Sequence, residues 1–329
     1  MPIRVYTSLE GALPCGKSAV ALGYFDGLHM GHAAVITQAV SKAENGLCPC
    51  VFTFTIKGGH PKAKRQDSGI ITERQKRALL EQWGVHLVLE PDFSEFQNMS
   101  PTEFVDEIVV KRMNAALVCC GSDFHFGYRA SAGVKELSAL CKERGIELDI
   151  IPPVTYQDER VSSTRIRTLL ADGKMEQAAV LLGRPFSYDF TVIPGRQLGR
   201  KLDFPTINQA MPNGFIHLRR GVYASFARVD GQLYPSVTNI GVRPTVDSAA
   251  QQVVSETSIA GFSRDLYGKN VEVGLLKFIR PEKTFPSVQA LREQIKKDSG
   301  DAFSYSRRYL SDTAKNGRIG ALQSAHTML

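Results

Sequence analysis

Short apolar runs alternate with amphipathic stretches over the first half of the chain. Between residues 19 and 151 the β-branched and aromatic runs have the length of strands, and apolar residues at helical spacing separate them. Strands that alternate with helices indicate βαβ units, so we expect a parallel sheet with helices on both faces. The predicted strands are Ala19–Phe25, Cys50–Phe54, Val85–Leu89, Ala116–Cys120 and Leu148–Ile151.

Two helix starts in this half carry capping signals. Thr72 is followed by Gln75, and Ser100 is followed by Pro101 and Glu103. In such capping boxes, side chains satisfy the backbone amides of the first helical turn. Ligands of parallel sheets bind beyond the carboxyl ends of the strands, so we expect a site at that edge.

The pattern changes after Gly183. Alternating runs such as Gly221–Ala227 and Val271–Phe278 are separated by Pro, Gly and Asn-Gly or Asp-Gly steps, which is typical of a small antiparallel β barrel. From Pro286 onward, apolar residues return to helical spacing. The sequence therefore predicts two domains, residues 1–183 of α/β type and residues 184–329 of all-β type with a terminal helix.

The charge distribution changes at the same boundary. Residues 1–183 contain 20 Lys and Arg against 21 Asp and Glu, whereas residues 184–329 contain 20 against 12, and the net charge is +7. The hydrophobic fraction of 43% and charged fraction of 22% exclude a disordered chain, a collagen-like repeat and a membrane bundle. The cations of the second half cluster in glycine-containing turns (Arg196, Arg200, Lys201) and in the C-terminal helix rather than alternating with aromatic residues along strands, so we do not expect a nucleic-acid partner.

The cysteines and the N-terminus indicate the compartment. No signal-peptide pattern and no run of about 18 apolar residues occurs, so we expect a cytoplasmic protein without a membrane partner. The cysteines form no Cys-x-x-Cys pair, and we expect reduced thiols rather than a metal site or disulfides. They are Cys15, Cys48, Cys50, Cys119, Cys120 and Cys141.

The first candidate site lies where the first strand meets the first helix. Glycines there allow close approach to a phosphate, the helix N-terminus offers free amides, and His29 and His32 are three residues apart. This pattern suits a triphosphate, although a glycine-rich turn with two surface histidines has the same sequence. The expected ligand-binding residues are Gly23, Phe25, Asp26, Gly27 and Gly31, and His29 and His32 would face the same ligand.

Two further segments of the first domain carry candidate residues. Ser163, Thr164 and Arg165 begin a helix and form either a helix cap with a solvated charge or the second half of a phosphate clamp. Together with His-x-Gly-His, this segment resembles the nucleotidyltransferases. The resemblance implies a Rossmann-like sheet, a catalytic role for His29, His32 and Arg165, and a binding role for Ser163 and Thr164. The run from Gly121 to Arg129 is either a hydrophobic plug or a platform for a planar ring.

The run from Gly121 also resembles a segment of bacterial FAD synthetases. That family pattern is Gly-x-Asn/Asp-Phe-x-Phe-Gly, and the resemblance implies contacts with the flavin and adenine ends. The matching residues here are Asp123, Phe124 and Phe126.

The second candidate site lies in the β domain. Glycines and cations precede Pro-Thr-x-Asn, and Thr206 and Asn208, two apart on an extended segment, offer neutral oxygens that suit Mg²⁺ held mainly by a nucleotide. A basic turn before a strand is an equally good interpretation of the bare motif. The candidate residues are Gly195, Arg200, Lys201, Pro205, Thr206 and Asn208.

The order of motifs across both domains resembles the bacterial bifunctional riboflavin kinase/FAD synthetases. After Pro-Thr-x-Asn come Arg220-Gly221-Val222-Tyr223, Asn239-Ile240-Gly241, Glu256-Thr257 and Phe278-Ile279-Arg280-Pro281-Glu282. The resemblance implies a Greek-key kinase barrel in which Mg²⁺ binds Thr206 and Asn208, Glu256 acts as base and Arg280 is a binding residue. It also implies two ATP-dependent reactions in series, riboflavin to FMN and FMN to FAD.

The chain departs from the family pattern at several positions. After Thr53-Phe54, residues 55–65 replace the usual Pro-His-Pro with a longer basic loop. In the barrel, Asp203, Ile207, Ser258 and Gly261 stand where the family usually has other residues, and a carboxylate beside a phosphate loop would repel the ligand. We expect kinase activity to be retained with altered affinity.

Three alternatives remain open from the sequence. The first is an FAD synthetase with an impaired kinase domain, and the second is a nucleic-acid-binding β module fused to a nucleotidyltransferase. The third is a cytidylyltransferase acting on a polyol phosphate, which the first domain alone would allow. We expect small-molecule substrates only, and a monomer or weak homo-oligomer.

Overall fold

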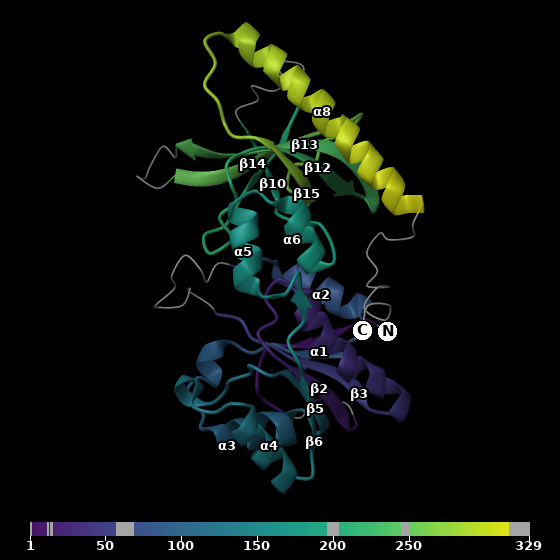
Figure 1. Cartoon of the computed structure of the whole chain (residues 1–329), viewed down its shortest axis with the longest axis vertical. Helices are drawn as coiled ribbons and strands as arrows, with labels where there is room; N and C mark the ends of the chain where they lie inside the picture. The colour runs from purple at the N-terminus through teal and green to yellow at the C-terminus, as the bar shows by residue number, and fades with distance from the viewer. Residues whose placement is uncertain are drawn as a thin grey trace. The chain divides into compact units, whose positions relative to one another are not determined.

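The computed structural model describes residues 2–11, 13, 16–56, 69–195, 204–244 and 251–315 (Figure 1). These residues fold into two compact units. The first unit contains the described residues up to 56 and residues 73–162. The second contains residues 69–72 and 163–315, so two helices that precede the predicted boundary at 183/184 belong to the second unit.

The first unit is built on a six-stranded parallel sheet, as predicted, with the strand order β1-β4-β3-β2-β5-β6. The central strand β2 is fully buried, because every residue of its Ser-Ala-Val-Ala-Leu segment faces the sheet's covered sides. The strands are β1 Arg4–Tyr6, β2 Ser18–Leu22, β3 Cys48–Phe52, β4 Leu87–Leu89, β5 Ala115–Gly121 and β6 Glu147–Ile151.

Two of these strands end earlier than the sequence predicted. Strand β2 ends at Leu22 and β3 at Phe52, so Gly23–Phe25 and Thr53–Phe54 lie in the loops at the carboxyl edge of the sheet. The prediction overran because the apolar and aromatic pattern continues past the last ladder hydrogen bonds. Strand β1 was not predicted, since three residues are too few to show a period.

Helices connect these strands. The capping box at Ser100 is confirmed, since Glu103 N donates to Ser100 Oγ at 3.2 Å and Ser100 N donates to the Glu103 carboxylate at 2.7 Å. The helix that starts there continues as a π-helix, Phe104–Arg112. The α-helices are α1 Met30–Ser41, α2 Glu73–Gln82, α3 Pro101–Glu103 and α4 Val134–Glu143. The shorter elements are the 3-10 turns Lys42–Asn45, Phe93–Glu95 and Tyr128–Ala130 and the hairpin β7 Thr155–Tyr156 and β8 Glu159–Arg160.

The second unit is a seven-stranded antiparallel sheet that curls into a half-barrel, with the order β10-β11-β14-β13-β12-β15-β9. This confirms the predicted all-β character and the terminal helix. The strands are β9 Phe186–Tyr188, β10 Val192–Ile193, β11 Ile207–Ala210, β12 Gly221–Val229, β13 Gln232–Pro244, β14 Gln251–Ile259 and β15 Glu272–Arg280. The helices are α5 Ser163–Ala171, α6 Met175–Leu182 and α8 Val288–Lys315.

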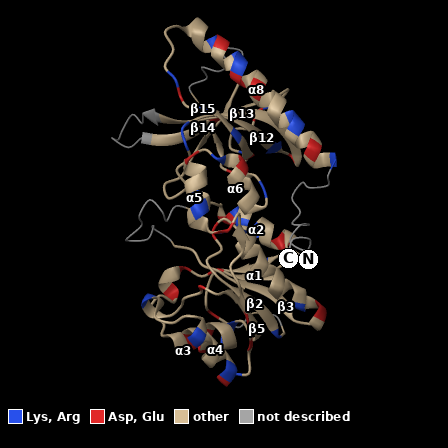
Figure 2. Ribbon diagram, viewed as in Figure 1, with Lys and Arg blue, Asp and Glu red and all other residues tan. Residues whose placement is uncertain are grey.

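Helix α8 lies across β12 and β13 (Figure 1). It packs with a face of small and polar residues, and Ser306 Oγ donates to Ser236 O at 3.4 Å. Figure 2 shows both Lys or Arg and Asp or Glu along this helix. None of the described helices, α8 included, has both the length and the apolar character that crossing a membrane requires.

Candidate functional site

The loop from Gly23 to His29 leaves the carboxyl end of the central strand β2 and leads into α1. His29 caps this helix, because its Nδ1 accepts a hydrogen bond from His32 N at 3.3 Å. The two imidazole rings stack, with centroids 3.6 Å apart and planes 18° from parallel. The structure therefore brings the two predicted histidines together at a helix N-terminus, the arrangement expected for binding an anion.

The same loop holds two bulky residues in the left-handed region. Phe25 has φ +53° and Leu28 φ +44°, and both are buried. Residues other than glycine rarely adopt this backbone conformation, which persists only where the surrounding structure holds it. The Phe25 ring lies edge-on to His32 at a centroid distance of 5.3 Å. This backbone conformation thus positions one of the two histidines.

At Gly23 and Gly31, aromatic side chains of the same protein occupy the space that a Cβ would need. A Cβ on Gly23 would lie 2.8 Å from the Phe25 ring, and one on Gly31 would lie 3.1 Å from the His29 ring. Gly27 has φ +81°, a value that favours glycine. The glycines are therefore needed to build the loop before any phosphate arrives, a reason that the sequence did not reveal.

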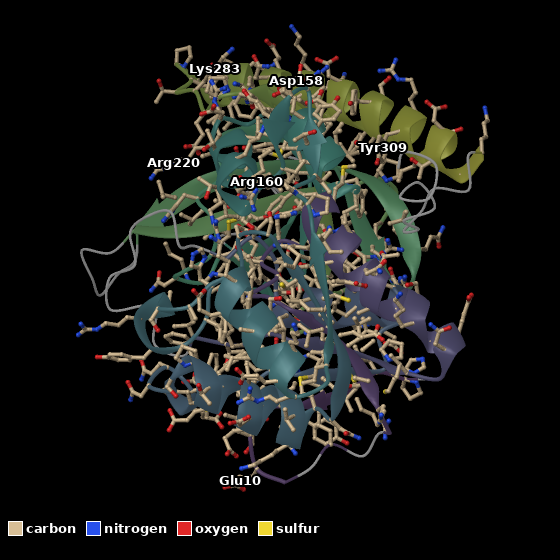
Figure 3. All side chains as sticks on the ribbon, turned by 60° about the horizontal axis from the view of Figure 1, so that its bottom comes forward. Glu10, Asp158, Arg160, Arg220, Lys283 and Tyr309 are labelled. Atoms are coloured by element: carbon tan, nitrogen blue, oxygen red, sulfur yellow. The ribbon has the colours of Figure 1, made fainter. Side chains whose placement is uncertain are left out.

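The loop after β5 is anchored by ion pairing and aromatic packing. Asp123 forms an ion pair of 2.6 Å with Arg160, which ends the β7–β8 hairpin (Figure 3). Phe124 and Phe126 stack at 5.7 Å. Phe126 is buried against Phe104, so its ring belongs to the aromatic core, while Phe124 is only partly buried. Of this pair, Phe124 offers the more accessible surface for a planar ring.

Three predicted residues of the first site open a helix of the second unit. Ser163, Thr164 and Arg165 form the first turn of α5. Thr168 Oγ1 donates to Thr164 O at 3.2 Å within that helix. A clamp that joins Arg165 to His29 and His32 stays a prediction.

The sequence missed a set of polar residues at the carboxyl edge of the first sheet. Thr53 directly follows β3, Glu90 directly follows β4, and Lys76 and Arg77 reach them from α2. All but Arg77 are buried. The signal that would have found them is their position, since polar residues directly after buried parallel strands mark the ligand edge of such a sheet.

In the second unit, a row of polar side chains crosses three strands. Asn208 on β11 pairs in register with Glu256 on β14, and Glu256 pairs with Asn239 on β13. Residues opposite one another in an antiparallel sheet point to the same face, so these three side chains share one face. Thr206 lies two residues before Asn208, next to β11. The structure thus brings Asn208 and Glu256 together and adds Asn239, to which the sequence had assigned no role, while a place for Thr206 beside Glu256 stays a prediction.

The turn after β10 packs directly against this row. A Cβ on Gly195 would lie 2.3 Å from Asn208 Nδ2. Gly195 therefore allows the backbone to approach the Asn208 amide, which is itself buried. Pro205 is exposed beside Thr206. Arg200, Lys201 and Asp203 lie outside the described residues, as does most of the basic loop after Ile56.

The opposite face of β14 carries a buried chain of hydroxyl groups. Tyr188 bonds Ser255 at 2.6 Å, Thr257 bonds Thr238 at 2.9 Å, and Thr238 bonds Ser225 at 2.8 Å. Burial raises the pKa of the Tyr188 hydroxyl well above its usual value. Since Ser255 and Thr257 flank Glu256 in the strand, this network fixes the backbone that carries the carboxylate.

Arg280 is engaged by the terminal helix. Its Nε and Nη2 donate to Asp298 on α8 at 2.9 and 2.5 Å, and its Nη1 donates to Pro281 O at 2.9 Å. Both side chains are largely buried. The connection to α8 that follows contains Lys283 (Figure 3). The observed role of Arg280 is structural, and the predicted ligand contact stays a prediction.

Neither the cysteines nor the acidic residues form a metal centre in the described part of the chain. No cluster of three or more His, Cys, Asp or Glu side chains is arranged to hold a metal ion there. None of the five described cysteines is in a disulfide bond, and burial raises the pKa of Cys119 and Cys120 to about 12 and that of Cys141 to about 11. These thiols are inert structural residues.

Comparisons with known proteins match both units. A family model described as FAD synthetase matches residues 14–165, and one described as riboflavin kinase matches residues 182–306. The bifunctional riboflavin kinase/FMN adenylyltransferase of Bacillus subtilis is 35% identical over 88% of this chain and 92% of its own. That of Escherichia coli K12 is 33% identical over 85% and 90%.

A solved structure also shares the fold of both units. It is described as a macrolide-efflux protein from Streptococcus pneumoniae. It is 28% identical to this chain, covers 91% of it and 98% of its own length, and has a TM-score of 0.80.

Proposed function

Because the chain belongs to the family of bifunctional riboflavin kinase/FMN adenylyltransferases, we propose an assignment of its residues to the two reactions of that family. The enzyme phosphorylates riboflavin to FMN with ATP, and it then converts FMN to FAD with a second ATP, releasing pyrophosphate. The riboflavin kinase match over residues 182–306 favours neither an impaired kinase nor a nucleic-acid-binding module. We assign adenylyl transfer to residues 1–183 and phosphorylation to residues 184–329.

In adenylyl transfer, a phosphate oxygen of FMN attacks the α-phosphorus of ATP. The new P–O bond forms as the bond to the bridging oxygen breaks, and pyrophosphate leaves with that electron pair. The FMN phosphate is already ionised at neutral pH, so no protein base is required. Stacked His29 and His32 at the N-terminus of α1, with Arg165, would stabilise the charge that develops on the phosphates.

In the kinase reaction, the 5′-hydroxyl of riboflavin attacks the γ-phosphorus of ATP. Glu256 accepts the hydroxyl proton as the new P–O bond forms, while the bond from the γ-phosphorus to the bridging oxygen breaks and ADP leaves with that electron pair. The Asn208 amide oxygen is a hard donor beside this carboxylate, and Thr206, two residues earlier, would add a hydroxyl, so the residues present fit Mg²⁺. The ion would neutralise charge on the β- and γ-phosphates. The pairing of Asn208 with Glu256 is the observation that carries this assignment, since it puts base and metal ligand side by side.

The remaining predicted binding residues are divided between the two reactions. From the family resemblance we propose as binding residues of the first reaction Gly23, Phe25, Asp26, Gly27, Gly31, Asp123, Phe124, Phe126, Ser163 and Thr164, and of the second Gly195, Arg200, Lys201, Pro205 and Arg280. The expected cytoplasmic location, the absence of a nucleic-acid partner and the monomeric or weakly oligomeric state stay predictions.

A product time course with two variants tests the assignment. With riboflavin and ATP, His29→Ala stops at FMN, because only the second reaction needs the histidines. Glu256→Ala makes neither product from riboflavin but still converts supplied FMN to FAD. His86→Ala and Glu293→Ala are the matched controls, since both side chains are exposed outside the two centres. Loss of both reactions in either test variant, or of neither, contradicts the assignment.

A further inference from the structure

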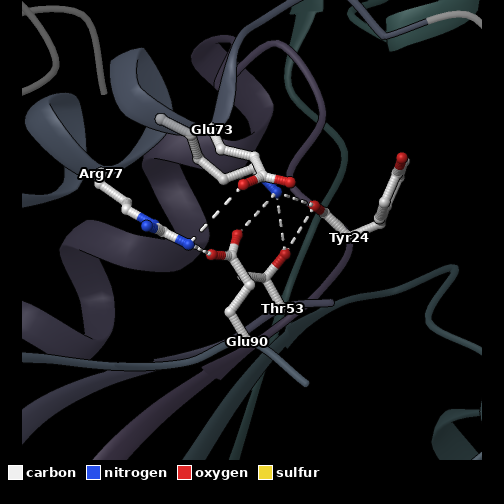
Figure 4. A network of polar contacts seen from close by, with 6 residues as sticks. Tyr24, Thr53, Glu73, Arg77 and Glu90 are labelled. Carbon is white, nitrogen blue, oxygen red and sulfur yellow. Dashed lines mark hydrogen bonds and ion pairs between the residues drawn. The ribbon is translucent and has the colours of Figure 1, made fainter. Parts of the chain in front are cut away.

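A buried polar network joins the carboxyl ends of three strands of the first sheet to the start of α2 (Figure 4). Glu90, which follows β4, is 1% exposed. Arg77 donates to its carboxylate from Nη2 at 2.6 Å and from Nε at 3.1 Å. Lys76 Nζ lies 3.8 Å from the other carboxylate oxygen of Glu90. The carboxylate is therefore satisfied chiefly by Arg77, and the ammonium of Lys76 has its closest contacts elsewhere.

Those closer contacts are with the loop that leaves β2. Lys76 Nζ donates to the backbone carbonyl of Tyr24 at 3.2 Å and to Thr53 Oγ1 at 3.2 Å. Thr53 Oγ1 in turn donates to the same carbonyl at 2.8 Å. Two donors from two different elements thus converge on one backbone oxygen, at the point where the histidine loop begins.

Burying this ammonium is costly. Lys76 is 7% exposed, and burial lowers its pKa while Glu90, Asp26 and Glu73 act in the opposite direction. Replacing buried charges by apolar side chains of similar volume is often neutral or stabilising. Stability alone therefore gives little reason for a lysine here, and its contact with the loop is the better explanation.

The Tyr24 carbonyl controls the geometry of the histidine pair. It belongs to the peptide that precedes Phe25, the residue held at φ +53°. The Phe25 ring lies against Gly23 and edge-on to His32, which stacks on His29 at 3.6 Å. A rotation of the peptide between Tyr24 and Phe25 would move the Phe25 ring and, with it, the packing of both imidazoles.

We propose that Lys76 is a positioning residue for adenylyl transfer, which holds the Tyr24 carbonyl and through Phe25 keeps His29 and His32 in their stacked arrangement. This inference rests on the proposed role of the two histidines. Lys76 acts through the loop, so its removal displaces groups that stabilise the transition state more than it weakens the binding of ATP.

The test compares four variants of the full-length enzyme, with riboflavin phosphorylation in the same preparation as the internal standard. In Lys76→Met, the kcat for converting FMN to FAD falls about 100-fold, the loss expected for a misplacement of about 1 Å, while the KM for ATP changes little. Lys76→Arg recovers part of the lost kcat, because it restores a cationic donor. A purely structural lysine would lower the yield or the thermal midpoint of the protein and leave kcat per folded enzyme unchanged.

Thr53→Val and Arg77→Met form a matched pair. Thr53→Val removes the second donor to the Tyr24 carbonyl and keeps the shape, so it lowers kcat in the same direction as Lys76→Met but by less. Arg77→Met disturbs the same buried carboxylate without touching the loop carbonyl, so kcat stays at the wild-type value. If Lys76→Met does not fold, this pair decides the question, and equal kcat values for the two overturn the proposal.

The experiments distinguish an error in the role of Lys76 from an error in the proposed role of His29 and His32. If His29→Ala loses FAD formation and folded Lys76→Met keeps wild-type kcat, the role of Lys76 is wrong and the assignment of the histidines stands. If His29→Ala keeps FAD formation, the assignment of the histidines is wrong, and the positioning role of Lys76 is wrong with it.

Discussion

Gly195 lies against Asn208 in the proposed kinase site, at a position where only a hydrogen atom fits. A Cβ at this position would lie 2.3 Å from Asn208 Nδ2 and 2.6 Å from its Cγ. Contacts of this length do not occur between real atoms, so either the turn or the amide would have to move. Because Asn208 is buried on the row that includes Glu256, movement of the amide shifts a predicted Mg²⁺ ligand relative to the base.

Gly195→Ala therefore impairs the first reaction and spares the second. We expect kcat/KM for riboflavin phosphorylation to fall about 100-fold, the typical effect of a displacement of about 1 Å at a reacting centre. Conversion of supplied FMN to FAD stays at the wild-type rate. Gly300→Ala on α8 is the control, since a Cβ there meets no atom within 4 Å. Equal kinase activity of the two variants would show that the turn has room to move.

Functional residues could be predicted from the sequence where one short, continuous motif contains them. Thr206, Asn208 and Glu256 were found from motifs, and the register of β11 and β14 then brought two of them together. Lys76 could not be found in this way, because its partners follow three different strands and its helical position has an ordinary amphipathic pattern. The sequence likewise suggested that Gly23 approaches a phosphate, whereas the space it leaves holds the Phe25 ring.

Among the secondary-structure elements, predictions succeeded where the period was sustained. The buried β2 and β5 and, in the second sheet, β12 and β15 were recognised, with ends shifted by a few residues. The sequence did not predict that Phe104–Arg112 is a π-helix. The capping box at Ser100 is that of an α-helix, and the spacing of the apolar residues fits an α-helix as well as a π-helix. The packing of α5 and α6 in the second unit arises from contacts that no local pattern encodes.

One buried ion pair joins α8 to the end of β15. Asp298 accepts from Arg280 at the end of β15, and its other oxygen accepts from Gln294 at 2.8 Å. The carboxylate is 6% exposed and the guanidinium 14%. Breaking a buried pair by removing one partner leaves the other charge without compensation, which is more costly than removing both.

Asp298→Ala consequently destabilises the second unit by about 3 kcal/mol. The measurement is urea unfolding followed by far-UV circular dichroism, together with hydrogen exchange of the α8 amides. The double variant Arg280→Met with Asp298→Leu recovers most of the lost stability, because no unpaired charge remains. If the double variant is as unstable as Asp298→Ala, packing of the helix rather than the charge pair holds it in place.

The two units differ in the ionisable groups that they bury. The first buries the thiols of Cys119, Cys120 and Cys141, whose pKa values burial raises to about 12, 12 and 11. The second buries the hydroxyls of Tyr188 and Tyr223, whose pKa values are also raised by burial. In both cases the folded state favours the neutral form. The stability of each unit therefore falls at alkaline pH. The thiols of the first unit begin to lower it at a lower pH than the tyrosines of the second unit.

The alkaline limit of the first unit gives a prediction with a defined sign. An unfolded thiol ionises near pH 9, so the stability that these cysteines contribute is complete below that pH and is lost as pH rises towards the folded values of about 11 and 12. Each thiol adds up to about 1.4 kcal/mol per pH unit to the slope of the unfolding free energy against pH.

Trp83 is the single tryptophan and lies in the first unit, so its fluorescence follows the unfolding of that unit in urea titrations. Cys119→Ala lowers the unfolding free energy at pH 7 through its cavity, but flattens the slope above pH 9 by about one proton relative to wild type. Cys48→Ala, at a partly exposed position on β3, is the control and keeps the wild-type slope. A slope in Cys119→Ala equal to that of the wild type would mean that other groups set the alkaline limit.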